Sequence, residues 1–522
     1  MQESEDVESP EFWFLKTMER FSEEIETSER QSSWTNAPTN RRERLQLLWD
    51  YVTGNPPLPY IADKYRGIFA QVMRKARTNY ALLVVEAMTD HSKVASVTTE
   101  ADEDFDGDEF AALIHEASGF EAMHSDIQTF LYTFGEAYAQ VVPPAEGLDV
   151  STTPPMMVAE DPRYCVGIPN PLLPGRLKSW VKVWNDEILD QQVAIFCYAG
   201  KRMIARRTPE TYSDTFNIDE WEWSTLPGEN AVDMAYLEAF GGVPVVRFDN
   251  KYGMGEFEPH IDVLDRIVDA VLQRVVIQWY QSFRQRAVSG DIDGGEDLTD
   301  TDETDSLIRS MHEGDDALRN LFEADPGSLW LLPEGVTFWE SGNTDFTPLQ
   351  KAIQDDVKAF ASVSRTPLTM FNPDGANQTA EGAATMKESH LDKVKNRQSR
   401  QTPGLVLLHQ IAFAMGGQEN RASRVKIHWQ NPERTTLQMK GDFMAKANGV
   451  LSRKRILAKV LDMTPDEIRL NEKELLEEAM MAATMAAQFE PEPAAEDEPT
   501  DDTSQSDDTD QSDESAADAE AA

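Results

Sequence analysis

Residues 362–384 of this 522-residue chain, SVSRTPLTMFNPDGANQTAEGAA, predict the end of one long helix, a loop and the start of another helix. Upstream, FTPLQKAIQDDVKAFASV has apolar residues at helical spacing, and Thr366-Pro367 ends that helix because proline disfavours helical geometry in the residue before it. Thr379 can cap a second helix that starts near Ala380. The residues between are rich in Asn, Pro and Gly, which indicates a short exposed loop.

A longer helix is predicted upstream, from residue 258 to about residue 286. Apolar residues recur there every three or four positions, and aspartates occupy other positions. At 1.5 Å per residue this helix is about 40 Å long, and a rod of that length needs a partner along its apolar stripe. The alternative is an ordinary buried helix of a large globular protein. The stripes of this helix and of the helix before the loop include Leu264, Val268, Val271, Val275, Trp279, Leu349, Ile353, Val357 and Phe360.

An excursion at about residues 290–343 separates these two helices. It begins with the acidic segment DIDGGEDLTDTDETDS and continues with a short predicted helix. Two apolar segments, GSLWLLP and VTFWES, then predict a pair of strands. Because both ends of the excursion return to the helices, we expect it to project from one end of them.

The part of the chain before the long helix changes from helical to β-like patterns. Residues 40–142 are mostly helical, and DIQTFLYTFGEAYAQVV predicts a helix that gives way to a strand at Gly135. Between 154 and 246, SWVKVWND and QQVAIFCYAG predict strands on either side of a turn near Asn185-Asp186. We therefore expect a mainly helical α+β domain. Cys165 and Cys197 are too few for a disulfide scaffold or a four-cysteine metal site, and we expect both in the core.

The helix after the loop contains the densest basic stretch of the chain, MKESHLDKVKNRQSRQ. Three uses of this stretch remain open: a solvated helix face, salt bridges to an acidic neighbouring subunit, and contact with DNA phosphates. Pro-Gly at 403–404 predicts an interruption or kink of the helix, and Gly-Gly at 416–417 predicts its end. The basic residues of the stretch are Lys387, Lys393, Lys395, Arg397 and Arg400.

The two ends of the chain have distinct compositions. EFWFLKTMERFSEEIE predicts an amphipathic helix, and we interpret residues 1–39 as an extension that packs late or on a neighbour. Toward the other end, Ser452 can cap the helix RKRILAKVL, and Thr464 with Glu467 forms a capping-box pattern before a further helix. Residues 490–522 contain fourteen acidic residues and no Lys or Arg, so we expect a disordered tail. Its alternative uses are repulsion of DNA, binding of basic scaffold or host proteins, and solubility.

The overall charge and the absent motifs limit the function. A net charge of −45 and a pI near 4.4 disfavour tight, sequence-reading DNA binding, because an acidic surface repels phosphates. No apolar run approaches the ~20 residues of a membrane-spanning helix, and no secretion signal opens the chain, so we expect a soluble protein made in the cytosol. The motifs G-x-x-x-x-G-K-[ST], H-E-x-x-H and G-x-S-x-G are absent, so we predict neither an ATP-driven motor nor another enzyme.

Two acidic runs were candidates for metal sites, and neither meets the requirements. Asp102, Asp104, Asp106 and Gly107 match a calcium loop, but Leu113 stands at the twelfth position, where a bidentate Glu is needed. The other run lies in a Thr-rich stretch that lacks the rigid scaffold of a two-metal nuclease. We predict no metal and no cofactor. The second run consists of Asp300, Asp302, Glu303 and Asp305.

The order and spacing of these patterns resemble the portal proteins of long-tailed double-stranded DNA phages, over about residues 40–488. The helix, Thr-Pro stop, exposed loop and long basic helix are the first point of resemblance. LLWDYVTGNPPLPY at 47–60 is similar to a family helix with its Gly- and Pro-rich turn. FGGVPVVRFDN at 240–250 is similar to the family strand that precedes the long stem helix. The resemblance implies a portal fold with wing, stem, clip and crown regions around a ring axis.

The resemblance also implies the boundaries of these regions. They are an N-terminal extension at 1–39; the first part of the wing, with helices and a β insertion, at 40–255; the first stem helix at 256–289; the clip at 290–343; the second stem helix at 344–366; the channel (tunnel) loop at 367–379; the long wing helix at 380–428; the crown at 429–489; and the disordered acidic tail at 490–522.

The function implied by the resemblance is a non-enzymatic channel at one capsid vertex, formed by a ring of about twelve copies. Double-stranded DNA would pass through it without sequence-specific binding during packaging and ejection. The implied partners are the terminase large subunit, major capsid and scaffold proteins, and a head-completion or adaptor protein, with no membrane. The protein would be found in the virion, and in the host cytoplasm during assembly. The channel-loop residues would be Thr369, Met370, Phe371, Asn372, Asp374, Asn377 and Gln378.

Two other classes of protein remain alternatives. A minor head or adaptor protein without channel function fits the acidic tail and the helices, but it does not need two paired helices with an intervening excursion. A metal-dependent nuclease fits the acidic runs, although their scaffold is missing.

Overall fold

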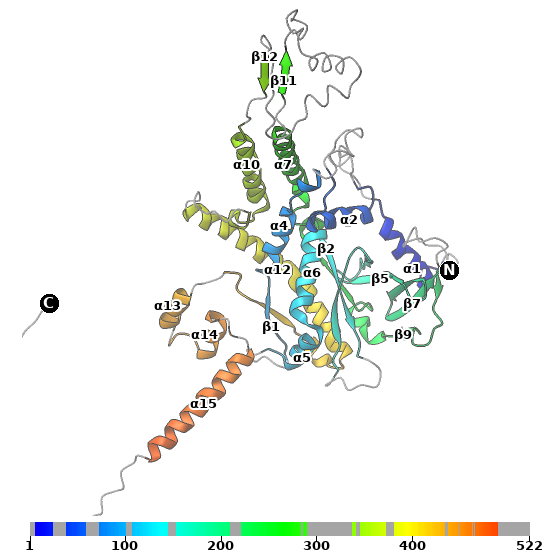
Figure 1. Cartoon of the computed structure of the whole chain (residues 1–522). Helices are drawn as coiled ribbons and strands as arrows, with labels where there is room; N and C mark the ends of the chain where they lie inside the picture. Colours follow the sequence, from blue (N-terminus) through cyan, green and yellow to red (C-terminus); the bar gives the residue numbers. More distant parts are fainter. Residues whose placement is uncertain are drawn as a thin grey trace, which may run out of the picture. The chain divides into compact units, whose positions relative to one another are not determined.

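The computed structural model of the chain (Figure 1) consists of a large unit, Met1–Pro465, and a small unit, Asp466–Ala522. Only part of the chain is described. The described residues are 6–24, 38–58, 73–100, 107–144, 153–208, 221–282, 286–289, 337–340, 345–371, 380–433, 437–447, 449–461, 463 and 465–488.

The described residues form helices and strands in roughly equal number. The helices are α1 (Pro10–Glu19), α2 (Arg41–Val52), α4 (Tyr80–Thr89), α5 (Glu109–Ser118), α6 (Phe120–Phe134), α7 (Ile261–Ser282), α10 (Thr347–Ser364), α11 (Leu368–Phe371), α12 (Ala380–Met415), α13 (Leu437–Ala447), α14 (Arg453–Val460) and α15 (Pro465–Gln488). The strands are β1 (Val94–Thr98), β2 (Glu136–Val142), β3 (Met156–Glu160), β4 (Cys165–Pro169), β5 (Leu177–Asp186), β6 (Gln191–Tyr198), β7 (Lys201–Arg207), β8 (Glu222–Trp223), β9 (Val232–Asp233), β10 (Val245–Asp249), β11 (Arg286–Ser289), β12 (Thr337–Glu340) and β13 (Lys426–Trp429).

These strands form four antiparallel sheets. The largest has the order β4-β5-β6-β7-β8, with β9 also paired to β7. A three-stranded sheet has the order β10-β2-β3, and two-stranded sheets pair β1 with β13 and β11 with β12. Helices and sheets therefore occur in one mixed architecture, as the α+β prediction requires.

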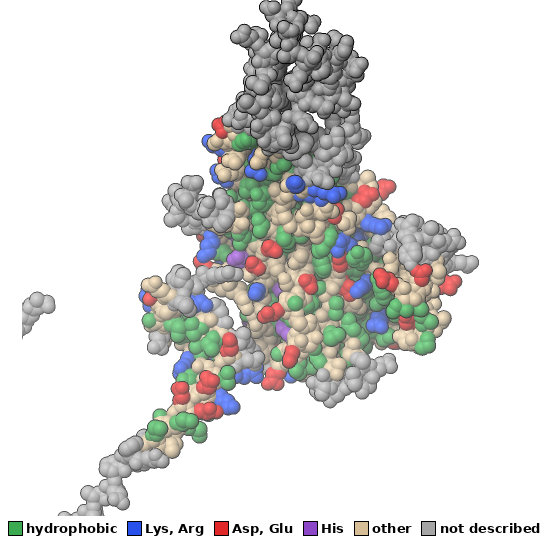
Figure 2. Space-filling view, viewed as in Figure 1, with side chains coloured by type: hydrophobic (Ala, Val, Ile, Leu, Met, Phe, Trp, Pro, Cys, Tyr) green, Lys and Arg blue, Asp and Glu red, His purple; other side chains and the backbone are tan. Residues whose placement is uncertain are grey.

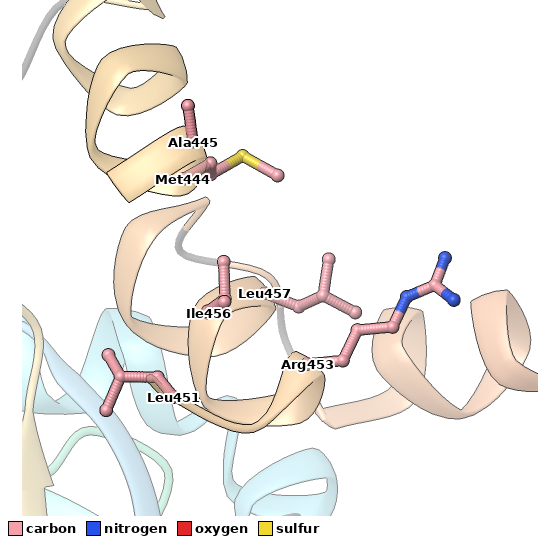
Figure 3. A pocket seen from close by; sticks show the side chains of 6 residues that line it. All are labelled: Met444, Ala445, Leu451, Arg453, Ile456 and Leu457. Atoms are coloured by element: carbon pink, nitrogen blue, oxygen red, sulfur yellow. The ribbon is translucent and has the colours of Figure 1, made fainter. Parts of the chain in front are cut away.

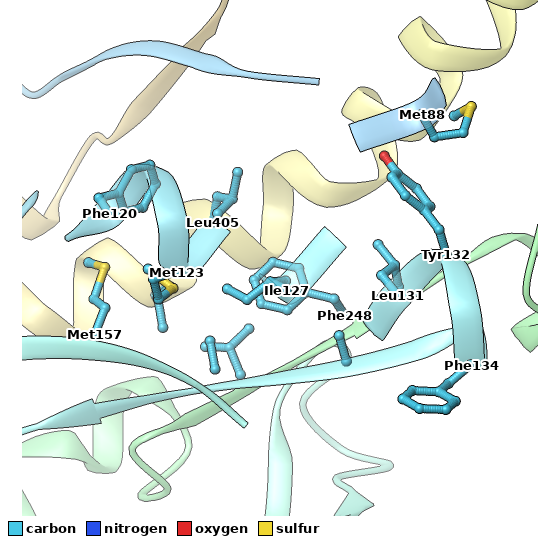
Figure 4. Close-up of a cluster of buried hydrophobic side chains, with 14 of the residues drawn as sticks. Met88, Phe120, Met123, Ile127, Leu131, Tyr132, Phe134, Met157, Phe248 and Leu405 are labelled. Atoms are coloured by element: carbon cyan, nitrogen blue, oxygen red, sulfur yellow. The ribbon is translucent and has the colours of Figure 1, made fainter. Parts of the chain in front are cut away.

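The main core lies where α6 and α12 pack against the three-stranded sheet. Ile127 and Leu131 of α6, Phe248 of β10 and Leu405 of α12 are at most 3% exposed (Figure 4). The predicted change from helix to strand at Gly135 is confirmed: α6 ends there with a φ of 82°, and β2 begins at the next residue. Glycine adopts this left-handed conformation without steric cost.

A second core lies under the N-terminal helix α1. Phe14, Met18 and Phe21 are buried against the inner face of the largest sheet, and Thr17 Oγ1 lies 2.7 Å from Ser179 Oγ of β5. The expectation that the extension at residues 1–39 packs on a neighbour is therefore wrong for α1, and the expectation that it packs late stays a prediction. Its apolar stripe is covered by the sheet of its own chain, because the face of the sheet that meets α1 is itself apolar.

Both cysteines lie in the core, as predicted. Cys165 of β4 and Cys197 of β6 are fully buried free thiols in one cluster with Trp180. Burial raises the pKa of the Cys197 thiol to about 12, so it stays uncharged at neutral pH. These residues act as small apolar side chains.

The helices on either side of the predicted loop have the expected boundaries. α10 begins at Thr347 with a proline in its first turn, and it ends before Arg365, which has a φ of 55°. α12 begins at Ala380, while Thr379 lies outside the described residues. Near the other end of the chain, the hydroxyl of Ser452 accepts the amide of Arg455 at the start of α14, as predicted.

Two predictions about the long helices need correction. α7 ends at Ser282, before the predicted residue 286, because residues 286–289 form β11 and pair with β12. The predicted strand VTFWES corresponds to β12, whereas GSLWLLP lies outside the described residues. Pro403 also does not interrupt α12, which continues to Met415, while the alternative of a kink at this proline stays a prediction. Buried residues after the proline, such as Leu405 and Leu408, hold this part of the helix in the core.

Gly404 allows α12 to approach the three-stranded sheet. A Cβ atom at this position would lie 2.6 Å from the ring of Phe248, which is 3% exposed and has no space to move into. At Gly441 of α13, by contrast, a Cβ atom would meet nothing within 4 Å. Both glycines lie inside helices, and they differ in the space that is available for a Cβ atom.

Three histidines form a buried group between α5, α6 and α12. His115 Nε2 and His409 Nε2 lie 2.8 Å apart, and His409 Nδ1 lies 2.7 Å from the carbonyl oxygen of Leu405. These distances require that His409 donates from Nδ1 and accepts at Nε2 from His115. Burial lowers the pKa of His409 and of His124 to about 4. All three rings are therefore neutral at pH 7.

Substitution of Gly404 by Ala is expected to destabilise the protein by about 1–3 kcal/mol, because the added methyl group overlaps the Phe248 ring. The matched change Gly441→Ala is expected to stabilise it by about 0.5–1 kcal/mol through helix propensity. Urea unfolding of both variants measures the difference. Equal effects of the two substitutions would contradict the close approach at Gly404.

Acid is expected to destabilise the protein through the buried histidines. Their pKa is lowered in the folded state, so their contribution is complete above pH 6.5 and is lost as the pH falls toward about 4. Each shift corresponds to a loss on the order of 3 kcal/mol. The variant His409→Gln should show a smaller drop in melting temperature between pH 7 and pH 5 than the wild type. Thermal unfolding of both proteins at the two pH values measures the drops, and equal drops would contradict the prediction.

Candidate functional site: a helix pair and the ion cluster at its base

α7 and α10 lie side by side and form what we call the helix pair (Figure 1). The ring centroids of His260, just before α7, and Phe360 of α10 lie 6.3 Å apart, and Arg266 Nη2 lies 2.9 Å from Asp356 Oδ1. Because residue numbers rise along α7 while those of the contacted residues fall along α10, the two helices are antiparallel. β11 follows α7 and β12 precedes α10, so the two-stranded β11-β12 sheet lies at the other end of the pair. The end at residues 260 and 360 is called the base.

The predicted apolar stripes are buried most completely near the base. Leu264 and Val268 of α7, and Val357 and Phe360 of α10, are at most 7% exposed. Farther along the pair the stripe residues are only half-buried within one chain, and the Trp279 side chain lies outside the description. The half-buried residues are Val271, Val275, Leu349 and Ile353. One chain therefore does not cover the outer half of its own stripe.

A buried ion cluster lies directly below the helix pair. It consists of Glu256, Lys393 and Arg397, whose side chains are 3%, 7% and 12% exposed. Lys393 Nζ lies 2.7 Å from Glu256 Oε2, and Arg397 Nε lies 2.5 Å from Glu256 Oε1. Asn250 Nδ2 donates to the same Oε1 at 3.0 Å. Both oxygens of the carboxylate are therefore hydrogen-bonded.

The ion cluster joins three parts of the chain. Glu256 lies in the segment that leads into α7, and its amide donates to the Tyr132 carbonyl of α6 at 2.7 Å. Lys393 of α12 also donates to the carbonyl of Ser364, the last residue of α10, at 2.8 Å. One lysine therefore connects the start of α7, the end of α10 and the middle of α12.

Lys393 and Arg397 keep the carboxylate of Glu256 charged. Burial by itself would raise the pKa of Glu256, but Lys393 and Arg397 outweigh burial and lower it to about 2. Burial lowers the pKa of Lys393, and Glu256 partly offsets that shift. The carboxylate is thus ionised at neutral pH, and removal of its charge would leave two buried cations without an anion.

A second ion pair holds the segment before α7. The guanidinium of Arg44 in α2 binds the carboxylate of Glu258 through two contacts of 2.6 Å each. Arg44 Nη2 also donates to the carbonyls of Phe134 and Gly253, each at 3.0 Å. The base of the helix pair is therefore attached to both α2 and α6.

The structure gives different environments to the five basic residues of α12. Lys393 and Arg397 are engaged inside the chain by Glu256, a use that was not among the three alternatives considered from sequence. Lys387 forms a 3.7 Å surface pair with Glu433, which is consistent with a solvated face. Lys395 and Arg400 are exposed, and their use stays a prediction.

The predicted channel loop is partly helical. Thr369, Met370 and Phe371 belong to α11, and Phe371 packs against Tyr80 and Phe360 with ring centroids 5.6 and 5.7 Å away. Phe371 therefore lies in a short helix and not in a loop, and the role of these residues in a channel stays a prediction. The remaining loop residues, Asn372, Asp374, Asn377 and Gln378, lie outside the described residues.

Sequence reasoning missed Glu256, Glu258 and Arg44. The two glutamates stand just before a helix, where acidic residues are common because they interact favourably with the helix dipole. Because this local role accounts for both glutamates, nothing in the sequence indicated partners more than one hundred residues away. Lys393 and Arg397 were noticed as part of a basic stretch, but not as a pair one helical turn apart on one face.

Within the described residues, no group of three or more His, Cys, Asp or Glu side chains is arranged to hold a metal ion. Helices long and apolar enough to cross a membrane are likewise not found in this part of the chain. Asp102, Asp104 and Asp106 lie outside it, as does the acidic run at 300–305.

Comparison with known proteins shows the family. The family described as phage portal protein, SPP1 Gp6-like, matches residues 33–484, and the chain belongs to this family. It is a family of structural proteins, not of enzymes. No curated protein matches the chain.

Two solved structures of particle necks are similar to the chain. One is the neck of a native GTA particle computed with C12 symmetry, with 13% identity, a TM-score of 0.39, and coverage of 79% of this chain and 93% of that chain. The other is the neck of an empty GTA particle computed with C6 symmetry, with 13% identity, a TM-score of 0.39, and coverage of 78% and 93%.

Substitution of Glu256 by Gln is expected to lower the free energy of unfolding by about 3–5 kcal/mol, because it leaves two buried cations without an anion. The control Asp356→Asn removes the anion of a pair whose Arg266 side chain is 57% exposed, and it should cost at most about 1 kcal/mol. Chemical unfolding of the two variants measures both values. Equal small losses would show that the cluster does not hold the base of the helix pair.

Proposed function

We propose that this chain forms the channel of a phage portal, as a ring of about twelve copies at one vertex of the capsid. Family membership supports this proposal, and the observation that carries it is the antiparallel helix pair with the β11-β12 sheet at its far end. In this proposal α7 and α10 are the stem helices. The excursion at 290–343 is the clip, and residues 429–489 form the crown.

The outer face of α10 supports contact between neighbouring copies. Ala352, Ala359 and Val363 are exposed in the single chain, and they lie at intervals that place them on one side of the helix. Small side chains allow a second helix to approach closely. The half-buried stripe of the helix pair adds apolar surface that a neighbour would cover. Contacts of one face with a different face of the next copy close into a ring.

The charge of the chain supports passage of DNA without adhesion. A net charge of −45 means that a channel wall gains little from release of counterions, so the duplex would be confined but not held. The loop between α11 and α12 would touch the DNA weakly and without reading its sequence. Its proposed contact residues are Asn372, Asn377 and Gln378, with Asp374 opposing a grip on phosphate.

The proposed partners follow from the position of each region. The excursion at 290–343 would bind the terminase large subunit during packaging and a head-completion or adaptor protein afterwards. The wing would contact the major capsid and scaffold proteins. The protein would be assembled in the host cytoplasm and remain in the virion, where the same channel serves ejection.

The ring is tested by a charged residue on the outer face of α10. Ala359→Arg is expected to abolish rings, because it places a long cation where a neighbouring helix would pack closely, while the melting temperature of the subunit stays near that of the wild type. Negative-stain electron microscopy and sedimentation velocity measure assembly. Ala117→Arg, the same change at an exposed alanine of α5, is the control and should form rings.

Two outcomes would contradict the proposal at different levels. Rings of normal size from Ala359→Arg would remove α10 from the interface and leave the ring itself intact. A wild-type chain that stays monomeric at every concentration, with no rings on the grid, would contradict the portal channel.

A further inference from the structure

The helices α13 and α14 form an apolar surface that is incompletely covered. Ala447, Ile456 and Val460 are buried between them, but Phe443 is 53% exposed and Val450 is 81% exposed. Hydrophobic atoms are visible at the surface over these two helices (Figure 2). We call the surface formed by residues 437–461 the α13–α14 surface.

This surface contains a pocket of 540 Å³ between the two helices (Figure 3). Its lining is mostly apolar, and Arg453 at the start of α14 lies at its edge. The lining residues are Met444, Ala445, Leu451, Arg453, Ile456 and Leu457. An apolar lining with a cation at its edge is complementary to a segment that carries apolar groups and negative charge.

The charge of the surface is opposite to that of the whole chain. Residues 437–461 contain six Lys or Arg and a single Asp, whereas the chain has a net charge of −45. Arg453, Lys454 and Arg455 are exposed in the first turn of α14, and Lys446 is exposed on α13. Of these, Arg453, Arg455 and Lys446 form no ion pair with a described residue. An isolated concentration of positive charge favours an anionic partner.

The chain itself contains a segment of matching chemistry. Residues 490–522 hold fourteen Asp or Glu, no Lys or Arg, and several Ala and Pro residues. Fully extended, these 33 residues span at most ~110 Å, which exceeds the ~36 Å length of the 24-residue helix α15 that precedes them. The segment is therefore long enough to return to α14 whatever the direction of α15.

We propose that the α13–α14 surface is the docking site of the acidic segment 490–522 of this chain. The carboxylates of the segment pair with the cations of α13 and α14, and its small apolar residues cover the exposed surface around the pocket. Tethering favours this partner, because a linked segment has a local concentration of roughly millimolar. The proposal is independent of the ring, since it requires only a single copy of the chain.

Docking has a consequence for DNA. The α13–α14 surface is a concentration of cations that would otherwise attract phosphates. An acidic segment bound there neutralises the surface and keeps it from holding the genome. DNA is therefore the competing occupant, and the experiment distinguishes the two.

The first experiment measures binding of a fluorescent peptide of residues 489–522 to a variant that ends at Gln488. Arg453→Glu combined with Arg455→Glu should weaken binding by about tenfold or more, which corresponds to 1.4 kcal/mol. Glutamate in the first turn of a helix is favourable, so this change is not expected to unfold α14. Arg74→Glu with Lys75→Glu, a charge reversal at two exposed residues elsewhere, is the control and should leave binding unchanged.

The second experiment uses the full chain. A glutamate-specific protease should cut within residues 490–522 more slowly in the wild type than in the Arg453→Glu, Arg455→Glu variant, because docking protects the segment. Equal cleavage rates, or peptide binding that the charge reversal does not weaken, would overturn the proposal. If a 20-base-pair duplex binds the full chain as tightly as it binds the variant ending at Gln488, and loses binding on the charge reversal, the surface is a DNA site and the proposal is wrong.

Discussion

The carboxylate of Glu256 is the group on which the geometry of the helix pair depends. It is buried and receives Lys393 and Arg397 from α12, while its own amide binds the end of α6. A buried ion pair contributes little net stability compared with apolar packing, but a displaced partner leaves a buried charge and costs several kcal/mol. The cluster therefore specifies position more than it adds stability. It determines where α7 starts and how α12 crosses beneath it.

The same cluster also contacts the end of α10, just before the loop that leads to α12. Lys393 binds the carbonyl of Ser364 at the end of α10, and His390 Nδ1 lies 3.0 Å from the carbonyl of Arg365. On the other side, Phe371 packs against Phe360 at the base of the helix pair. Buried contacts therefore fix the chain on both sides of this loop. This arrangement connects the loop to the helix pair through a small number of atoms.

Much of the fold was predictable because its signals are local. The end of α6 at Gly135, the proline at the start of α10 and the hydroxyl cap of α14 each depend on residues within one or two turns. Predictions failed where partners are distant in the sequence. Pro403 remains inside α12 because the core holds the helix on both sides, and α1 covers a sheet whose first strand begins 146 positions after the end of α1. Glu256 and its partners were missed for the same reason, since 137 positions separate the glutamate from Lys393.

The sequence by itself determined the helices flanking the loop, the long apolar stripe, the strand before it and the extreme acidity, because periodicity, turn residues and charge are properties of neighbouring residues. Only the tertiary structure decided which basic residues of α12 face inward, which strand pairs with β12, and that Phe371 packs against the core. These outcomes depend on burial, which sets both the strength of a charge pair and the cost of leaving it unmade. Burial is decided by segments that meet only after the chain has folded.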